Sequence, residues 1–382
     1  MEKEQGMNNL HISLTEMRNE SRVLKQASSI YNSSSFESVF ISSLWGEGLE
    51  MSENLNGVEL RRFDLKTRNY GNNLIIQILK YLEFTYTVYR NYRKNNIDII
   101  TIHALALLPL GCLLKVLYSS KLVYDAHELE TEKNGLGGLR KKLAKWLESI
   151  LIPFVDHTIV VSNSIADWYK SRYSIENVSV VFNSPIIKDI KKNNLLKSKL
   201  GIDSHIKLYI YQGVLSKGRG IDEILDVFGK ETADVAVAFM GYGMESEKIK
   251  EAASASDKIF YVPAVAPAEV LSYTASADVG ISFIEPVCLS YDYCMPNKVF
   301  EYLAVGLPVI VSNGKEMSNF VEEHGVGWHA SNFSSDELAK LVQHSCKQDT
   351  SIYEKRSKEI SEKYKWQHQE KLLLEVYKNV TE

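Results

Sequence analysis

Residues 295–312 read MPNKVFEYLAVGLPVIVS, and this stretch decides the fold class. Pro296 suits the first turn of a helix, because the N–H that proline lacks has no partner there in any case. Gly306 suits the left-handed residue that ends a helix, and Pro308 lies just beyond it. The apolar run VIVS at 309–312 is typical of a buried strand. The stretch therefore predicts a helix followed by a strand, the repeating unit of α/β domains.

The same alternation of apolar runs and helical patterns extends towards both ends of the chain. In the first half, the expected strands are Leu10–Leu14, Ile97–Ile102, Leu122–Tyr124 and Thr158–Val161. A second series begins at Lys207 with LYIYQG and continues through AVAFMGYG, KIFYVP, VGISF and PVIVS. Strands that alternate with helices favour parallel sheets covered by helices.

A change of composition divides the chain into two series. Asn183-Ser184-Pro185 interrupts the pattern, and the lysine-rich stretch Lys188–Lys199 is interpreted as the connection between domains. We predict an α/β protein with two doubly wound Rossmann-like domains that face each other across a cleft. The expected domains are residues 1–186 and 187–365, with a C-terminal helix at 366–382 that packs back on the first domain. Such sheets bind ligands at the carboxyl ends of their strands, so the cleft is the expected site.

The composition excludes several classes of protein. The 382 residues include 44 Lys and Arg against 48 Asp and Glu, a net charge of −4, whereas nucleic-acid-binding domains are usually basic. Four cysteines without a C-x-x-C pair and nine scattered histidines predict neither a disulfide framework nor a metal site. The N-terminus lacks a signal-peptide pattern, and the most apolar stretch, Ile97–Leu117, is interrupted by charged residues. We therefore expect a cytoplasmic protein, at most peripheral at the inner face of the membrane.

One predicted helix, Leu139–Ile150, is both amphipathic and basic. Its apolar stripe consists of Leu139, Leu143, Trp146, Leu147 and Ile150, and its cations are Arg140, Lys141, Lys142 and Lys145. Such a helix can lie on an anionic membrane, or it can pack its stripe on the core and leave the cations in solvent. We favour the second interpretation.

Two stretches contain residues suited to binding an anion. Lys298 and Glu301 lie on one face of the predicted helix, near the N-terminal end where free N–H groups attract anions. The loop in YQGVLSKGRGIDEILDVF, 211–228, brings together Lys217, Arg219 and three glycines and could cradle a diphosphate. On spacing alone, a surface Lys–Glu pair and a solvated turn explain these residues as well.

A third stretch, VYDAHELE at 123–130, places Asp125 and His127 at the end of an expected strand. His103 ends an earlier strand, but a lone histidine in such a place is more often structural. Gly241-Tyr242-Gly243 also follows a strand. Ser246 occupies the third glycine position of G-x-G-x-x-G, so the chain carries no dinucleotide fingerprint and a dehydrogenase is not predicted.

The pattern P-N-K-x-F-E-Y-L-A-x-G-x-P-V-I resembles the donor-binding segment of GT-B retaining glycosyltransferases of family four, the group 1 type. The resemblance covers nearly the whole chain. It implies a metal-independent, hexosyl-type transferase of the EC 2.4 class that retains anomeric configuration and needs no cofactor. The implied partners are a UDP or GDP sugar as donor and a glycan or lipid-linked acceptor, in bacterial surface polysaccharide synthesis.

The resemblance also implies roles for individual residues. Glu301 matches the glutamate that binds the nucleotide ribose, Lys298 and Arg219 match cations near the diphosphate, and His127 matches a histidine near the donor sugar. Catalysis is thus assigned to His127, Arg219 and Lys298, and donor binding to Gly213, Lys217, Arg219, Val262, Tyr293, Lys298 and Glu301. Tyr293 stands where the family usually carries a glutamate that contacts the sugar.

Two other functions stay open at this point. A nucleotide-sugar 2-epimerase has a similar fold but adds a pair of carboxylates and needs no acceptor. A non-catalytic nucleotide-sugar-binding subunit agrees with the missing glutamate. On the acceptor side, Thr15–Arg22 is expected to face the cleft, where Arg18 and Arg22 either meet an anionic acceptor or are surface charges. The sequence leaves the donor, the acceptor and the oligomeric state undetermined.

Overall fold

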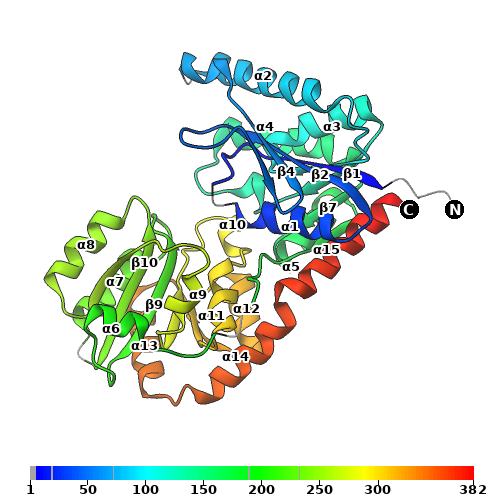
Figure 1. The fold of residues 1–382 in the computed structure, drawn as a ribbon. Helices are drawn as coiled ribbons and strands as arrows, with labels where there is room; N and C mark the ends of the chain where they lie inside the picture. The colour runs from blue at the N-terminus through cyan, green and yellow to red at the C-terminus, as the bar shows by residue number, and fades with distance from the viewer. Residues whose placement is uncertain (1–5, 19, 72, 188–189, 232) are drawn as a thin grey trace.

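The structure, a computed structural model, describes residues 6–18, 20–71, 73–187, 190–231 and 233–382. It consists of two α/β units, each built on its own sheet (Figure 1). The N-terminal sheet has the strand order β3-β4-β2-β1-β5-β6-β7-β8, parallel except for the β3–β4 pair. Its strands are β1 (Met7–Ile12), β2 (Phe36–Leu44), β3 (Ser52–Leu55), β4 (Val58–Phe63), β5 (Ile99–His103), β6 (Lys121–Asp125), β7 (His157–Val160) and β8 (Val178–Val180).

Helices cover both faces of this sheet. One core joins it to α2, α3 and α5, and a second core joins its other face to α1 and the C-terminal helix α15. The helices are α1 (Ser21–Asn32), α2 (Leu74–Tyr92), α3 (Leu108–Tyr118), α4 (Gly138–Leu151), α5 (Asn163–Tyr173) and α15 (Trp366–Thr381), with 3-10 turns η1 (Lys66–Tyr70), η2 (Leu105–Leu107), η3 (Glu130–Glu132) and η4 (Ile152–Phe154). Because both faces are covered, a central strand such as β5 is buried at all five residues.

The C-terminal sheet is parallel in every pair that the structure describes, with the order β11-β10-β9-β12-β13-β14. Its strands are β9 (Lys207–Val214), β10 (Val235–Tyr242), β11 (Ile259–Pro263), β12 (Val279–Ser282), β13 (Val309–Val311) and β14 (Gly327–His329). Its helices are α6 (Leu195–Leu200), α7 (Ile221–Lys230), α8 (Ser246–Ala255), α9 (Val270–Thr274), α10 (Leu289–Asp292), α11 (Asn297–Ala304), α12 (Lys315–His324), α13 (Ser335–Lys347) and α14 (Ser351–Tyr364). The predicted fold class, two parallel-sheet α/β domains, is confirmed.

Residues 295–312 contain α11 and β13. Pro296 occupies the N-cap position, one residue before the helix, with extended backbone, and Gly306 follows the helix with a φ of 82°. Of the lysine-rich stretch, residues 188–189 lie outside the described residues. Residues 195–200 form α6, whose Leu196 is buried in the C-terminal core, so this part of the stretch belongs to that core.

The C-terminal helix α15 runs back along the N-terminal unit (Figure 1). Trp366 Nε1 donates a hydrogen bond to Ser29 Oγ at 3.1 Å, and the Tyr377 hydroxyl lies 2.6 Å from Thr101 Oγ1 beneath β5. Both aromatic side chains are buried. The last helix of the chain therefore completes the core of the first unit.

Helix α4 departs from the expectation that its apolar stripe faces the core. Leu139, Leu143, Trp146 and Ile150 are all exposed, so that prediction is wrong. The inner face instead buries Glu148, whose carboxylate accepts hydrogen bonds from Tyr169, Tyr173 and Tyr124 at 2.6, 2.6 and 3.2 Å. Within the described residues, no helix is long and apolar enough to cross a membrane.

Candidate functional site

A cavity of about 500 Å³ lies between the two units and draws its walls from both. The N-terminal unit contributes Glu20, Ser21, Arg22, His127, Glu128, Val161, Ile165 and Asn183. The C-terminal unit contributes Tyr211, Gln212, Gly213, Val214, Arg219, Ser290, Tyr291, Cys294, Met295, Pro296, Asn297, Lys298 and Glu301. The carboxyl ends of β6 and β9 and the N-terminus of α11 thus meet at one place, as a doubly wound sheet favours.

On the C-terminal side, Lys298 projects from the first turn of α11. Its ammonium lies 3.5 Å from the centre of the Tyr211 ring, a cation–π contact. Burial, together with the nearby Arg219 guanidinium, lowers the pKa of Lys298 to about 7. An anion bound here would favour the charged ammonium and gain its full attraction.

Arg219 reaches the same cavity from the loop between β9 and α7. Its guanidinium lies 4.7 Å from the centre of the Tyr291 ring. The loop needs Gly220 with a φ of 72°, because a Cβ at this position would lie 2.0 Å from the carbonyl oxygen of Phe283. Among the described residues, neither Arg219 nor Lys298 forms an ion pair, so two cations line the cavity without a carboxylate partner.

Glu301 lies one turn further along α11 and is held by Gln212 at the end of β9. The Gln212 side-chain N–H donates to Glu301 Oε2, and its Oε1 accepts a hydrogen bond from Thr274 Oγ1 at 2.7 Å. Burial raises the pKa of Glu301. This chain of hydrogen bonds holds the Glu301 carboxylate in the wall of the cavity.

On the N-terminal side, Asp125 is fully buried at the end of β6 and receives hydrogen bonds from several groups. Arg22 donates to both of its oxygens, with contacts of 2.6 Å from Nη2 and 3.0 Å from Nε, and Gln26 Nε2 donates at 3.0 Å. Burial alone would raise the pKa of Asp125, but the Arg22 guanidinium and His127 hold that pKa well below its usual range.

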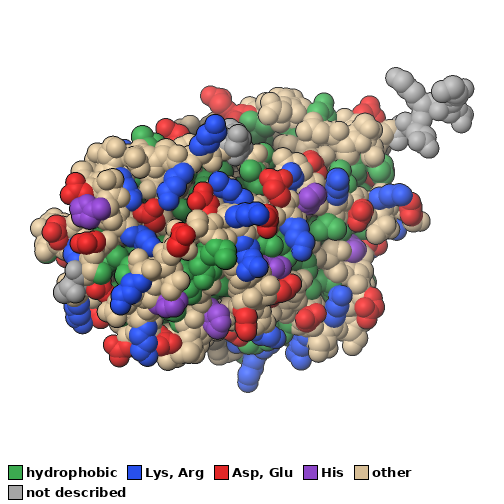
Figure 2. Space-filling view, turned by 90° about the horizontal axis from the view of Figure 1, so that it is seen from below, with side chains coloured by type: hydrophobic (Ala, Val, Ile, Leu, Met, Phe, Trp, Pro, Cys, Tyr) green, Lys and Arg blue, Asp and Glu red, His purple; other side chains and the backbone are tan. Residues whose placement is uncertain are grey.

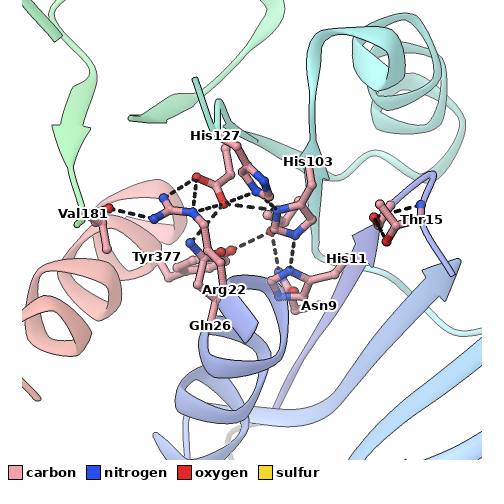
Figure 3. Close-up of polar contacts among 12 residues, drawn as sticks. Asn9, His11, Thr15, Arg22, Gln26, His103, His127, Val181 and Tyr377 are labelled. Atoms are coloured by element: carbon pink, nitrogen blue, oxygen red, sulfur yellow. Dashed lines mark hydrogen bonds and ion pairs between the residues drawn. The ribbon is translucent and has the colours of Figure 1, made fainter. Parts of the chain in front are cut away.

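Three histidines extend this network (Figure 3). Asp125 Oδ2 lies 3.1 Å from His127 Nε2 and 3.1 Å from His103 Nδ1, and His103 Nε2 lies 2.9 Å from His11 Nδ1. Burial lowers the pKa of His103 to about 4 and that of His11 well below its ordinary value. Two neutral rings thus stand behind His127, which alone of the three lines the cavity.

His103, Asp125 and His127 bring three possible metal-ligand atoms within 4.8 Å of one another. The sequence spacing did not indicate this cluster, because its members come from two strands and a loop. The Arg22 guanidinium already neutralises Asp125, and the ring nitrogens that face the carboxylate are hydrogen-bonded to it. The arrangement therefore suits a hydrogen-bonded ion pair better than a second cation.

The sequence matches two known families of glycosyltransferases. The family described as "Glycosyl transferases group 1" matches residues 192–366, and "Glycosyltransferase Family 4" matches residues 53–184. Together the two matches cover more than half of the chain. The chain belongs to the group 1 glycosyltransferases of the GT-B fold. A comparison with curated proteins finds no match.

Solved structures share this glycosyltransferase's architecture at low sequence identity. Sucrose-phosphate synthase from Thermosynechococcus elongatus superposes with a TM-score of 0.81 at 14% identity, over 98% of this chain and 99% of that one. Anabaena HepE in complex with UDP-glucose gives 0.76 at 14%, over 97% and 99%. The lipopolysaccharide outer core galactosyltransferase WaaB gives 0.66 at 12%, over 99% of each chain. At such identities the likeness shows the fold.

The glycosyltransferase's cavity brings together most of the site residues expected from the sequence. Gly213, Arg219, Lys298, Glu301 and His127 line it. The three expected donor-binding residues that do not line it are Lys217, Val262 and Tyr293. Each of these lies in a defined place elsewhere.

Lys217 lines a separate hollow together with Glu223, Glu245 and Glu285. Val262 is buried within β11. The Tyr293 carbonyl accepts a hydrogen bond from Ser162 Oγ at 2.7 Å across the contact between the two units. The aromatic ring of Tyr293 packs against the N-terminal core rather than in the cavity.

Arg22 shows what sequence reasoning missed in this glycosyltransferase. It was expected to be either an acceptor contact or a surface charge, and the surface-charge interpretation is wrong, because only 4% of the residue is exposed. Gln212 and Tyr211 were also missed. The sequence indicates these two residues only by their position, because both lie at the carboxyl end of β9, beside the expected Gly213.

Proposed function

We propose that this glycosyltransferase moves a hexose-type sugar from a UDP or GDP donor to a glycan or lipid-linked acceptor, with retention of anomeric configuration. The observation that carries the proposal is the pair of cations, Lys298 and Arg219, that line the cavity without carboxylate partners beside the N-terminus of α11. Two cations and free helix N–H groups suit a diphosphate. Anabaena HepE, a protein of the same fold, has a crystal structure in complex with UDP-glucose.

The proposed reaction needs stabilisation of the departing diphosphate. The glycosyl–phosphate bond breaks, positive charge develops on the sugar ring and negative charge on the leaving group. Lys298 and Arg219 would meet that negative charge, and one well-placed donor of this kind is worth about 3 kcal/mol. We propose that they do this without a metal or other cofactor.

Glu301 and His127 take the other roles in the proposal. Glu301, oriented by Gln212, would accept hydrogen bonds from the ribose hydroxyls of the donor. His127, held by Asp125 at 3.1 Å, would meet the donor sugar on the opposite side of the cavity. With retention, the acceptor hydroxyl attacks from the face that the diphosphate leaves, and a leaving phosphate oxygen takes its proton.

The proposed acceptor and cellular setting rest on the fold that this chain shares with WaaB. WaaB, which shares the fold, is described as a lipopolysaccharide outer core galactosyltransferase. We propose a related setting for this chain, surface polysaccharide synthesis at the inner face of a bacterial membrane, with peripheral rather than spanning attachment.

Binding of UDP and GDP, measured by thermal shift, tests the donor site. One nucleotide should raise the Tm of the wild-type protein, and Lys298→Ala and Glu301→Gln should abolish the rise. Lys217→Ala is the matched control, because this lysine belongs to the same loop region but lines a different hollow. A protein whose Tm responds to neither nucleotide would contradict the proposal.

Product analysis then separates transfer from its alternatives. Incubation of a nucleotide-sugar panel with acceptor mixtures should give a glycoside whose anomeric configuration, read by NMR coupling constants, equals that of the donor. Conversion of the donor without acceptor would instead show an epimerase. Binding without any turnover would show a non-catalytic subunit.

A further inference from the structure

An unusually apolar outer surface covers the side of the N-terminal unit formed by α2, α3 and α4. In Figure 1, α2 lies along the top of the molecule, with α3 and α4 beneath it. Leu139 on α4 is 81% exposed, Leu74 on α2 is 76% exposed and Val116 on α3 is 75% exposed. Soluble proteins rarely expose such groups together, and those that do usually bind a partner or a membrane there.

Helix α2 presents its apolar residues as one continuous stripe. The exposed side chains are Leu74, Ile75, Ile78, Leu79, Leu82 and Tyr86. At 3.6 residues per turn they fall within an arc of about 140°. The core contacts of α2 come from Tyr81 and from its second half, through Phe84, Val88 and Tyr92. The first half of the helix therefore offers its apolar stripe without packing it on the core.

Helix α4 and the turn after it present a second stripe. Leu139, Leu143, Trp146 and Ile150 follow helical spacing, and the exposed Phe154 of η4 extends the stripe. The inner face of α4 buries Glu148 instead, so these apolar side chains do not pack in the core.

Helix α3 joins the two stripes into one layer. The Tyr81 hydroxyl of α2 accepts a hydrogen bond from the Leu110 backbone at 3.0 Å, and the rings of Tyr89 and Tyr118 stack with centres 6.0 Å apart. On the other side, Lys115 Nζ of α3 donates to the Phe154 carbonyl at 2.9 Å. The three helices thus lie side by side, and the outward side chains of α2, α3, α4 and η4 form what we call the apolar face.

The charges of the three helices themselves have one predominant sign, whereas Lys and Arg lie among Asp and Glu over the underside of the molecule that Figure 2 shows. The three helices contain seven cations, which are Lys80, Arg90, Lys115, Arg140, Lys141, Lys142 and Lys145. Their two carboxylates are both engaged. Glu83 accepts hydrogen bonds from the backbone of Lys66 and Thr67, and Glu148 is buried.

Two cations of α4 flank its apolar stripe without a carboxylate partner. Arg140 and Lys142 stand on opposite sides of the line from Leu139 to Leu143, and among the described residues neither forms an ion pair. Their neighbours Lys141 and Lys145 differ, because both reach Glu132 of η3. The edge of the stripe is therefore positive and open.

We propose that the apolar face docks on the surface of an anionic lipid bilayer. Helices with an apolar stripe flanked by Lys and Arg lie in the interface, with the stripe among the acyl chains and the cations at the phosphate groups. A second copy of the chain is a poorer occupant, because pairing two such faces would bring their positive edges together. The inference rests on the peripheral location in the proposed function and names the surface responsible.

Vesicle flotation of the full chain tests the inference. The protein should float with vesicles of equal parts phosphatidylcholine and phosphatidylglycerol, and much less with phosphatidylcholine alone. Arg140→Glu/Lys142→Glu should weaken the partition at least about tenfold, since each cation near such a surface contributes severalfold to binding. Leu143→Ser/Trp146→Ser should abolish flotation without lowering Tm, because both side chains are exposed in the folded protein.

Matched controls use exposed residues of the other unit. Met244→Ser/Ile352→Ser removes apolar side chains that are 84% and 70% exposed, and Lys355→Glu reverses a surface charge there. Both variants should float like the wild type. Trp146 fluorescence should also shift to the blue with anionic vesicles, and the Trp146→Phe variant should lose that change.

Three outcomes would overturn the inference. They are failure of the wild type to float with anionic vesicles, equal flotation of the Leu143→Ser/Trp146→Ser variant, and a dimer in light scattering that this variant converts to a monomer. The last result would assign the apolar face to a second copy. Thermal shifts with UDP and GDP on the same variants distinguish the docking proposal from the donor-binding proposal. A variant can lose flotation and keep its nucleotide-induced rise in Tm, or lose that rise and still float.

Discussion

Replacing Arg22 by leucine should destabilise the N-terminal unit strongly. The guanidinium pairs with the buried Asp125 through both oxygens and donates a further hydrogen bond to the Val181 carbonyl at 2.8 Å. Leucine fills part of the space but leaves the Asp125 carboxylate buried without the charge of the guanidinium. Removing one member of a buried ion pair typically costs about 3–5 kcal/mol, because the remaining charge loses its compensation.

For a domain of this size, such a loss corresponds to a fall in Tm of about 10 °C. Differential scanning calorimetry at pH 7.5 measures it directly. Arg18→Leu is the matched control from the same segment, because Arg18 pairs with Glu16 at the surface, where an ion pair is worth less than about 1 kcal/mol. Its Tm should stay within about 3 °C of the wild type.

The double variant Arg22→Leu/Asp125→Asn sharpens the test. Removing the charge from Asp125 eliminates the uncompensated carboxylate, so the double variant should lose less stability than the two single losses added together. A wild-type Tm for Arg22→Leu, or strict additivity in this cycle, would refute the view that Asp125 depends on Arg22 for its charge.

Three further outcomes follow from other contacts. Burial lowers the pKa of His103 from 6.5 to about 4, so this residue binds more protons in the unfolded chain between these values. The contribution of His103 to the free energy of unfolding in urea should therefore fall by about 3 kcal/mol as pH drops from 6.5 to 4, and His103→Gln should remove that part of the slope while the part due to His11 stays. Glu316 accepts backbone hydrogen bonds from Asn163 and Ser164 across the two units, both at 2.9 Å, so Glu316→Gln should speed limited proteolysis between them, and an unchanged cleavage rate would speak against this contact. Trp366→Ala should cost about 3–5 kcal/mol in calorimetry, because it opens the buried junction where α15 meets α1.

The fold and the places of Lys298, Glu301 and Arg219 were predictable from sequence because their signals are local. A helix start, a left-handed glycine and an apolar strand stand within 18 residues at 295–312, and their spacing alone places Lys298 and Glu301 on one helix face. The loop with Arg219 is equally local. Each of these residues lines the cavity.

The N-terminal half of the site was not predictable in the same way because its contacts are long-range. Arg22 meets Asp125 across 103 positions in the chain, and His11 meets His103 across 92. Strand order decides these neighbours, and the sequence predicts strands without predicting which of them are adjacent. His127 was placed by resemblance, and the network behind it appears only once β1, β5 and β6 lie side by side.

The prediction for helix α4 was wrong for a different reason. An apolar stripe at helical spacing shows that one face of a helix leaves water, but it does not say whether protein or lipid receives it. The deciding residue is Glu148, which the pattern places among the polar positions and the structure buries against three tyrosines. The side of α4 that faces the core therefore carries a buried carboxylate, and the apolar stripe faces outward.

The two walls of the cavity differ in their electrostatics, and this difference favours one orientation of a bound anionic ligand. On the N-terminal wall, Arg22 and Asp125 neutralise each other and the histidines behind them stay neutral. On the C-terminal wall, Lys298 and Arg219 have no such partner among the described residues. An anionic group entering the cavity is therefore drawn to the C-terminal wall, and the less charged end of the same molecule is left facing His127. The apolar face belongs to the N-terminal unit, so an acceptor held at a membrane would approach from the side that carries His127.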